Sequence, residues 1–213
     1  MANEVGREYR LEVQSTIDTA KTVTAISKAN PAVVSCASHG YLAGDIVVLT
    51  DVEGMVEVNN LVARVANPAA GTFELEGVDS TNFGTFTSGE VAEVTAFSTV
   101  SQATSIDYGQ GSAEEIDMTT LLDSARRTDL GTLSLPAATV NLFADVTSAV
   151  QTAIEAAAYA KTMLVFRATT KGGRKRLWAG IPSTIGESVA VNSPITGSFT
   201  INVKSPRYSH YAT

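Results

Sequence analysis

The residues that could support acid–base, nucleophilic or metal chemistry are few and scattered along this chain of 213 residues. It contains two histidines, His39 and His210, and a single cysteine, Cys36. Neither histidine belongs to a set of cysteines, histidines and carboxylates at the spacing of a metal site, so we expect both on the surface or in turns. Cys36 follows Val33 and Val34 in a strand-like run, where a free cysteine behaves as a small hydrophobic residue. The sequence therefore predicts no metal site and no covalent catalyst.

Known catalytic and cofactor motifs are also missing. The stretch from Gly109 to Gly111 contains two glycines of a dinucleotide fingerprint, but it lacks the third glycine and no helix follows it. There is no Gly-x-Ser-x-Gly elbow and no His-Glu-x-x-His helix. We therefore expect neither an enzyme nor a bound cofactor. A hydrolase would require a nucleophile within hydrogen-bond reach of His39 or His210.

Two charged segments remain as candidates for binding. In the first, basic residues flank a pair of glycines: Lys171, Arg174, Lys175 and Arg176. They could contact the phosphates of nucleic acid, but we favour an exposed hairpin tip or a partner for acidic loops of a neighbouring subunit.

The second charged segment is an acidic strand followed by a polar connector. With a period of two, Glu115 and Asp117 share one face of the strand, and Ile116 and Met118 share the other. The connector contains Arg126, Arg127 and Asp129, whose mixed charges could pair between subunits. Exposed ion pairs of this kind contribute only about 0 to 1 kcal/mol each.

Composition limits the class of protein further. Hydrophobic residues make up 44% of the chain and charged residues 17%, which is typical of a folded protein and not of a disordered one. The formal charge of −7 gives the molecule no general attraction for nucleic acid. No apolar run approaches the roughly 20 residues that span a bilayer, and the N-terminus lacks the apolar core of a signal peptide. We expect a protein without a membrane anchor, made in the cytoplasm, with one or two domains.

The pattern of apolar residues predicts a mainly β fold with one helix. Residues 7–15 alternate between apolar and polar, which indicates a half-buried strand. Asp145 is a favourable N-cap, and apolar residues recur at helical spacing up to Ala160, so we expect one packed helix over about 145–160. Val146 and Ala157 belong to its predicted buried face, and Gln151 to its wet face. Further short strands are predicted at 22–27, 33–36, 46–50, 61–66, 72–76, 91–95, 163–168, 174–180, 189–191 and 198–204.

The order of several weak motifs resembles the tail tube proteins of long-tailed bacteriophages. These motifs are Glu-Ile-Asp-Met-Thr-Thr from Glu115, Leu133-Ser134-Leu135, Phe143-Ala144-Asp145, Phe166-Arg167, Ala179-Gly180 and Thr196-Gly197-Ser198-Phe199-Thr200. The resemblance covers about residues 1–20 and 98–213. It implies an antiparallel β-sandwich with one packed helix, assembled in a virion tail.

The same resemblance implies the partners. Subunits of this family form rings of six that stack on a tape-measure protein, bounded by tail terminator and tip proteins, into a tube through which double-stranded DNA leaves the capsid. DNA would pass without specific binding. Glu115 and Asp117 are then candidates for a channel face, where repulsion would keep phosphates off the wall. An ordinary solvent-facing role for these acids remains open.

The short strand-like runs within residues 21–97 predict a small all-β domain inserted between the first two strands of the tube domain. The segments Ser38-His39-Gly40-Tyr41, Gly44-Asp45-Ile46-Val47 and Thr72-Phe73-Glu74-Leu75 resemble the small β-domain named after the first catalytic-cysteine half-domain of ubiquitin-activating enzymes. No ubiquitin chemistry follows from this resemblance. An alternative for the whole chain is a receptor-binding or adhesin-like β-protein of a virion, which would be a monomer or trimer.

Overall fold

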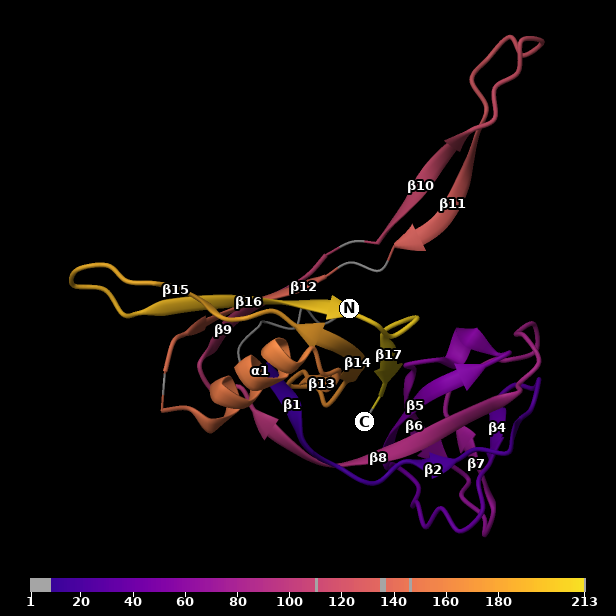
Figure 1. The fold of residues 1–213 in the computed structure, drawn as a ribbon, viewed down its shortest axis with the longest axis horizontal. Helices are drawn as coiled ribbons and strands as arrows, with labels where there is room; N and C mark the ends of the chain where they lie inside the picture. The colour runs from indigo at the N-terminus through magenta and orange to yellow at the C-terminus, as the bar shows by residue number, and fades with distance from the viewer. Residues whose placement is uncertain (1–8, 110, 135–136, 146, 213) are drawn as a thin grey trace.

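A computed structural model describes residues 9–109, 111–134, 137–145 and 147–212. Within these residues the protein is mainly β, with one α-helix packed against a curved antiparallel sheet (Figure 1). The strands before the helix are β1 (Arg10–Ile17), β2 (Lys21–Thr22), β3 (Ala25–Ile26), β4 (Ala32–Ser35), β5 (Ile46–Glu53), β6 (Val62–Ala66), β7 (Thr72–Leu75), β8 (Ser88–Thr99), β9 (Ala103–Tyr108), β10 (Ser112–Asp117), β11 (Thr128–Ser134) and β12 (Ala138–Phe143). The helix α1 (Ala149–Ala160) precedes β13 (Leu164–Thr169), β14 (Lys175–Pro182), β15 (Gly186–Ser188), β16 (Thr196–Val203) and β17 (Ser209–Tyr211), and a 3-10 turn, η1 (Val56–Val58), follows β5.

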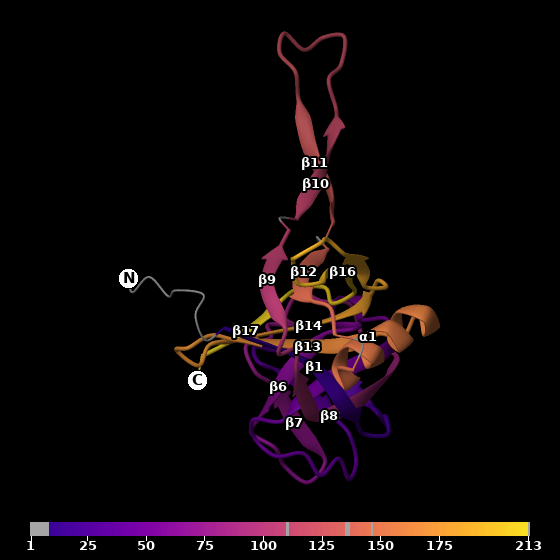
Figure 2. The same ribbon diagram turned by 90° about the vertical axis from the view of Figure 1, so that its left-hand side faces the viewer.

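One large sheet joins most of these strands. Its order is β3-β4-β7-β6-β5-β8-β1-β13-β14-β16-β12-β9, with β2 beside β8, β15 beside β16 and β17 beside β14. The strands β10 and β11 form a separate two-stranded ribbon that extends away from the rest of the molecule (Figures 1 and 2). We call this ribbon, residues 112–134, the arm. The body comprises the described elements that belong neither to the arm nor to residues 21–97.

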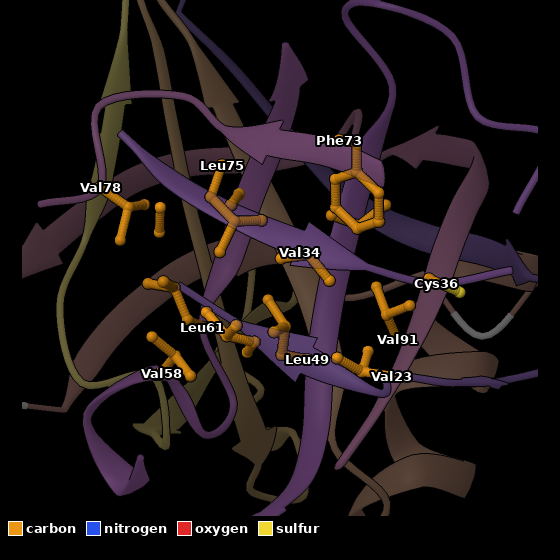
Figure 3. Packing of buried hydrophobic residues seen from close by; sticks show 14 of the residues in the cluster. Val23, Val34, Cys36, Leu49, Val58, Leu61, Phe73, Leu75, Val78 and Val91 are labelled. Carbon is orange, nitrogen blue, oxygen red and sulfur yellow. The ribbon is translucent and has the colours of Figure 1, made fainter. Parts of the chain in front are cut away.

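Residues 21–97, called the small β unit, enclose a hydrophobic core of their own (Figure 3). Its largest fully buried side chains include Phe73, Leu49 and Met55. Cys36 lies in this core with 1% of its surface exposed, which confirms its predicted packing role. Burial raises the pKa of its thiol, so the group is neutral and poorly nucleophilic.

The body has a second core between its curved sheet and α1. The rings of Trp178 and Phe166 stack with their centroids 5.7 Å apart, and Phe199 and Ile154 pack into the same cluster. Ile154 comes from α1, so this core fixes the helix on the sheet.

The strand β8 runs through both parts of the protein. Its first half pairs with β5 in the small β unit, and its second half pairs with β1 in the body. A third cluster lies where the two parts meet, with Val48 and Ala92 on one side and Leu177 on the other. This apolar contact ties the small β unit to the body along the length of one strand.

The C-terminal segment adds polar contacts across the same boundary. The hydroxyl of Ser205 donates to the carbonyl of Asn60 at 2.9 Å, and the hydroxyl of Ser209 donates to the carbonyl of Val62 at 2.5 Å. Both serines are buried. Because buried hydroxyls without partners are costly, these two bonds fix the position of the last strand.

The helix begins later than predicted. Its N-cap is Ser148, whose side chain accepts from the backbone N–H of Gln151, whereas Asp145 accepts from Thr147 in the preceding turn. Gln151 was predicted on the wet face, but it is buried, because its side chain bonds the backbone of Phe143 and Asp145. Val146 lies outside the described residues. The polar side chain of Gln151 thus fixes the loop that precedes the helix.

Most predicted strands are confirmed, with one clear exception. Residues 189–191 were predicted as a strand, but they form the turn after β15, which ends at Ser188. Val189 and Val191 are instead 72% and 90% exposed. The alternation that suggested a strand belongs to a loop with uncovered apolar side chains.

Candidate assembly interface

The arm gathers five of the candidate residues identified from sequence. Glu115 and Asp117 lie on β10, and Arg126, Arg127 and Asp129 lie in the returning half of the ribbon. The guanidinium of Arg126 lies 3.8 Å from the carboxylate of Glu115 and 3.4 Å from that of Asp117. All three side chains are more than half exposed, so water screens these pairs and they contribute little to stability.

Short-range hydrogen bonds shape the distal end of the arm. The carboxylate of Asp117 accepts from the backbone N–H of Thr119 at 2.9 Å and from its hydroxyl at 2.5 Å. Asp123 accepts in the same way from Thr120, at 2.8 and 2.9 Å. These bonds favour the ionised carboxylates and hold the pKa values of Asp117 and Asp123 below their usual range. The tip is therefore a shaped, charged turn.

Apolar side chains are uncovered on both faces of the arm. Ile116 is 51% exposed on one face, and Leu130, which pairs with Glu115 on the other, is 71% exposed. At the tip, Leu121 and Leu122 are almost fully exposed. An isolated two-stranded ribbon is marginally stable in water, and exposed apolar groups of this kind usually mark a contact with another molecule.

Two strands of the body also present open edges. Among the described residues, β9 pairs only with β12, and β15 pairs only with β16. The stretch β9-β12-β16-β15 therefore ends in unpaired backbone groups on both sides. Such edges readily accept a strand from another chain.

The basic cluster lies on the body, at the hairpin between β13 and β14. Gly173 adopts a positive φ of 82° there, a conformation that favours glycine in a tight turn. Arg176 does not project freely, because its guanidinium stacks over the ring of Tyr108 at 4.1 Å. Lys171 and Arg174 lie in the turn, and Lys175 begins β14. The structure thus separates the basic cluster from the acids of the arm.

The observation that decides the family is a match of the sequence to a family model. The model, described as phage tail tube protein, TTP, matches residues 53–213. The chain belongs to the phage tail tube protein family. A search of curated proteins finds no match. The match begins inside the small β unit, at the last residue of β5, so it includes β6, β7 and β8 as well as the arm and all of the body except β1.

Membership places this tail tube protein in the virion tail as a structural component. The geometry agrees, because its prominent features are open strand edges and a projecting ribbon. The resemblance of residues 21–97 to the half-domain of ubiquitin-activating enzymes stays a prediction. None of the described helical stretches has the length and apolarity to cross a bilayer.

His39 of the tail tube protein occupies a buried structural position. His39 was predicted on the surface or in a turn, but only 2% of it is exposed. Its Nδ1 accepts from the backbone N–H of Tyr41 at 3.0 Å, and its Nε2 donates to the carbonyl of Ala69 at 2.7 Å. Among the residues described, no group of three His, Cys, Asp or Glu side chains could hold a metal.

His210 lies exposed on β17 opposite Arg176, which confirms its predicted surface position. Partial burial of the ring, together with the nearby positive charges of Arg176 and Arg174, lowers its pKa. Sequence reasoning did not connect these residues or Tyr108, because they come from strands that are far apart in the chain. The sequence signal for this grouping was weak, because it consisted only of basic residues at 174–176 and tyrosines near the C-terminus.

Proposed function

We propose that this protein is the subunit of a phage tail tube, with six copies in each ring and the rings stacked around a channel for DNA. The open edges of β9 and β15 support ring formation, since joining one to the other in the next copy would pair their backbone groups. The same two edges on every copy close a ring if the rotation between copies is regular. Ring contacts should then bury roughly 2,000 Å² or more in total.

The observation that carries this proposal is the arm. It presents apolar side chains on both faces and at its tip, and the views in Figures 1 and 2 show it clear of the body. A second copy would cover Leu121 and Leu122 and remove their apolar surface from water. In this scheme Arg126, Arg127 and Asp129 contact neighbouring subunits, as do Lys171 and the basic residues 174–176.

Other tail components follow from the proposed assembly. A tape-measure protein would occupy the tube before DNA does, and terminator and tip proteins would bound its ends. Glu115 and Asp117 share the face of the arm that we propose for the channel, where their charge would repel phosphates. DNA would pass without specific binding, since repeated rings of basic groups would hold it instead.

We also propose that residues 21–97 form a unit inserted in the tube domain. Its separate core supports this division, although β8 continues without a break into the body. A unit of this size inside the tube would obstruct the channel, so we place it on the outer wall. There it would thicken the tube or bind cell-surface glycans weakly.

Electron microscopy of the purified protein tests the assembly. We expect long hollow tubes or stacked rings from the wild type, and mainly monomers from the variant Leu121→Ser with Leu122→Ser. The matched control replaces two exposed apolar residues of the small β unit, Leu42→Ser with Val56→Ser, and should assemble normally. A compact wild-type monomer or trimer at high concentration would instead favour the receptor-binding alternative.

A further inference from the structure

An open cleft lies where the curved sheet of the body fails to close. It has a volume of about 1190 Å³ and runs between the edge strand β9 and the ends of β1, β13, β14 and β17. Small-molecule sites usually enclose about 300–1,000 Å³ and bury most of their ligand, so this cleft is large and open by comparison. Its dimensions suit a segment of protein.

The charge of the cleft is opposite to that of the whole chain. Its lining includes Arg10, Arg174, Lys175, Arg176 and His210, and no aspartate or glutamate is among its described lining residues. The chain as a whole carries a formal charge of −7. A concave surface lined by one sign of charge concentrates the field within it and attracts the opposite charge.

Aromatic residues hold part of this charge in place. The hydroxyls of Tyr9 and Tyr108 are 2.5 Å apart, and Tyr108 packs edge-to-face on Trp178 with the ring centroids 5.4 Å apart. The guanidinium of Arg176 stacks over the ring of this tyrosine. Thr170 also lines the cleft, and its buried hydroxyl has no hydrogen-bond partner among the described residues. The cleft therefore offers a cation whose position is fixed by aromatic packing.

The arm has the complementary charge. Residues 112–134 contain five carboxylates and two arginines. The ion pairs within the arm involve Glu115, Asp117 and Asp123, whereas Glu114 and Asp129 are exposed on the opposite face of the ribbon. Ile116 pairs with Asp129 on that face. One face thus combines two carboxylates with an exposed apolar side chain.

We propose that the cleft of one copy is the docking site for the arm of a second copy, with Glu114 and Asp129 facing Arg10, Arg174 and Arg176. The proposal rests on the assembly proposed above and adds the receiving surface. The arm points away from the body in Figures 1 and 2, so it does not fill the cleft of its own copy. Because arm and cleft are different surfaces, their contact is heterologous, and repetition of it builds an extended stack.

A charge exchange tests this contact. The cleft variant combines Arg10→Glu with Arg174→Glu, and the arm variant combines Glu114→Lys with Asp129→Lys. Each variant alone places like charges on the arm and on the cleft that receives it. We therefore expect each alone to raise the critical concentration for tube formation at least about tenfold. An equimolar mixture should assemble if the two variants alternate. The unaltered acid arm of the cleft variant then meets the unaltered basic cleft of the arm variant, and the basic arm of the arm variant meets the acid cleft of the cleft variant.

Two matched controls carry the same change of charge elsewhere. Lys28→Glu with Lys204→Glu reverses two exposed lysines outside the cleft, and Asp18→Lys with Glu90→Lys reverses two exposed acids outside the arm. Both should form tubes as the wild type does. Thermal unfolding of each variant alone confirms that it is folded before mixing.

Three outcomes would overturn the docking site. Wild-type tubes together with normal assembly of both charge variants would remove this contact and leave the proposed function intact, as would folded variants whose mixture stays unassembled. Binding of a 20-base-pair DNA duplex that is lost only in the cleft variant, with normal assembly of the arm variant, would make the cleft a polyanion site. A wild-type protein that never assembles would refute the proposed function itself.

Discussion

Tyr211 and Arg64 join the last strand of the body to the small β unit. The backbone N–H of Arg64 donates to the Tyr211 hydroxyl at 2.9 Å, and the guanidinium lies 4.9 Å from the centre of the tyrosine ring. The same guanidinium donates to the carboxylate of Glu76, which lowers the pKa of that carboxyl. The side chain of Tyr211 is 6% exposed and packs in the cluster between the two parts.

Replacing Tyr211 should therefore loosen the small β unit from the body. Tyr211→Phe leaves the Arg64 N–H without its partner, and we expect a loss of about 1–3 kcal/mol in the free energy of unfolding. Tyr211→Ala also removes the ring and should cost about 3–5 kcal/mol. Chemical denaturation measures both. Equal stability of the two variants would show that the ring adds nothing to the contact.

A second prediction concerns the ion pair between Glu12 and Arg167 on neighbouring strands. The guanidinium Nε donates to the Glu12 carboxylate at 2.7 Å, and it also lies 4.1 Å from the centre of the Phe97 ring. Glu12 is only 6% exposed. Arg167→Ala would leave a buried carboxylate unpaired, and we expect a loss of about 3–5 kcal/mol.

The double variant Glu12→Leu with Arg167→Leu provides the comparison for that pair. It removes both charges and fills the space with apolar groups, so it should recover most of the lost stability. Urea unfolding of the wild type and both variants measures the difference. A double variant no more stable than Arg167→Ala would show that packing on Phe97, and not the unpaired charge, accounts for the loss.

His210 should make stability depend on pH. Its folded-state pKa is lowered below the ordinary value of about 6.5 by burial and by Arg176 and Arg174. The unfolded chain therefore binds more protons between the two pKa values, and stability falls as the pH drops through about 6.5. NMR titration of the ring gives the folded pKa, which should rise in Arg174→Gln. An unchanged pKa in that variant would exclude Arg174 as a cause and leave burial and Arg176 to account for the shift.

The sequence predicts local structure well where one face of an element is buried. The alternation of Leu11 and Val13 with polar residues identifies β1, and helical spacing around Ile154 identifies α1. Two neighbouring strands, β9 and β12, were not predicted. In β12 the buried Ala138, Val140 and Leu142 alternate with Thr139 and Asn141, so a usable signal was present. In β9 the small polar residues hide the pattern.

The candidate interface could be predicted only in part. The acids and arginines of the arm lie close together in the sequence, and their cluster was recognised. The cleft could not be recognised, because Arg10, Tyr108, Arg176 and His210 meet only when the sheet curves. Similarly, the burial of Gln151 depends on the backbone of the preceding loop, which no periodicity encodes.

The proposed channel face leads to the last prediction. Glu115 and Asp117 lie together on the arm with Arg126, on the opposite face from Glu114 and Asp129. The variant Glu115→Lys with Asp117→Lys removes two exposed and weakly stabilising pairs, so tubes should still form.

Each altered subunit then adds positive charge to the channel, and phosphate contacts would hold DNA with a salt-dependent affinity. We expect slower DNA delivery, measured as the rate of ejection from particles, with partial recovery at higher salt. The charge-matched variant Asp18→Lys with Glu90→Lys should eject at the normal rate. Unchanged ejection from tubes that contain the double variant would remove these acids from the channel and leave them as solvent-facing residues of the arm.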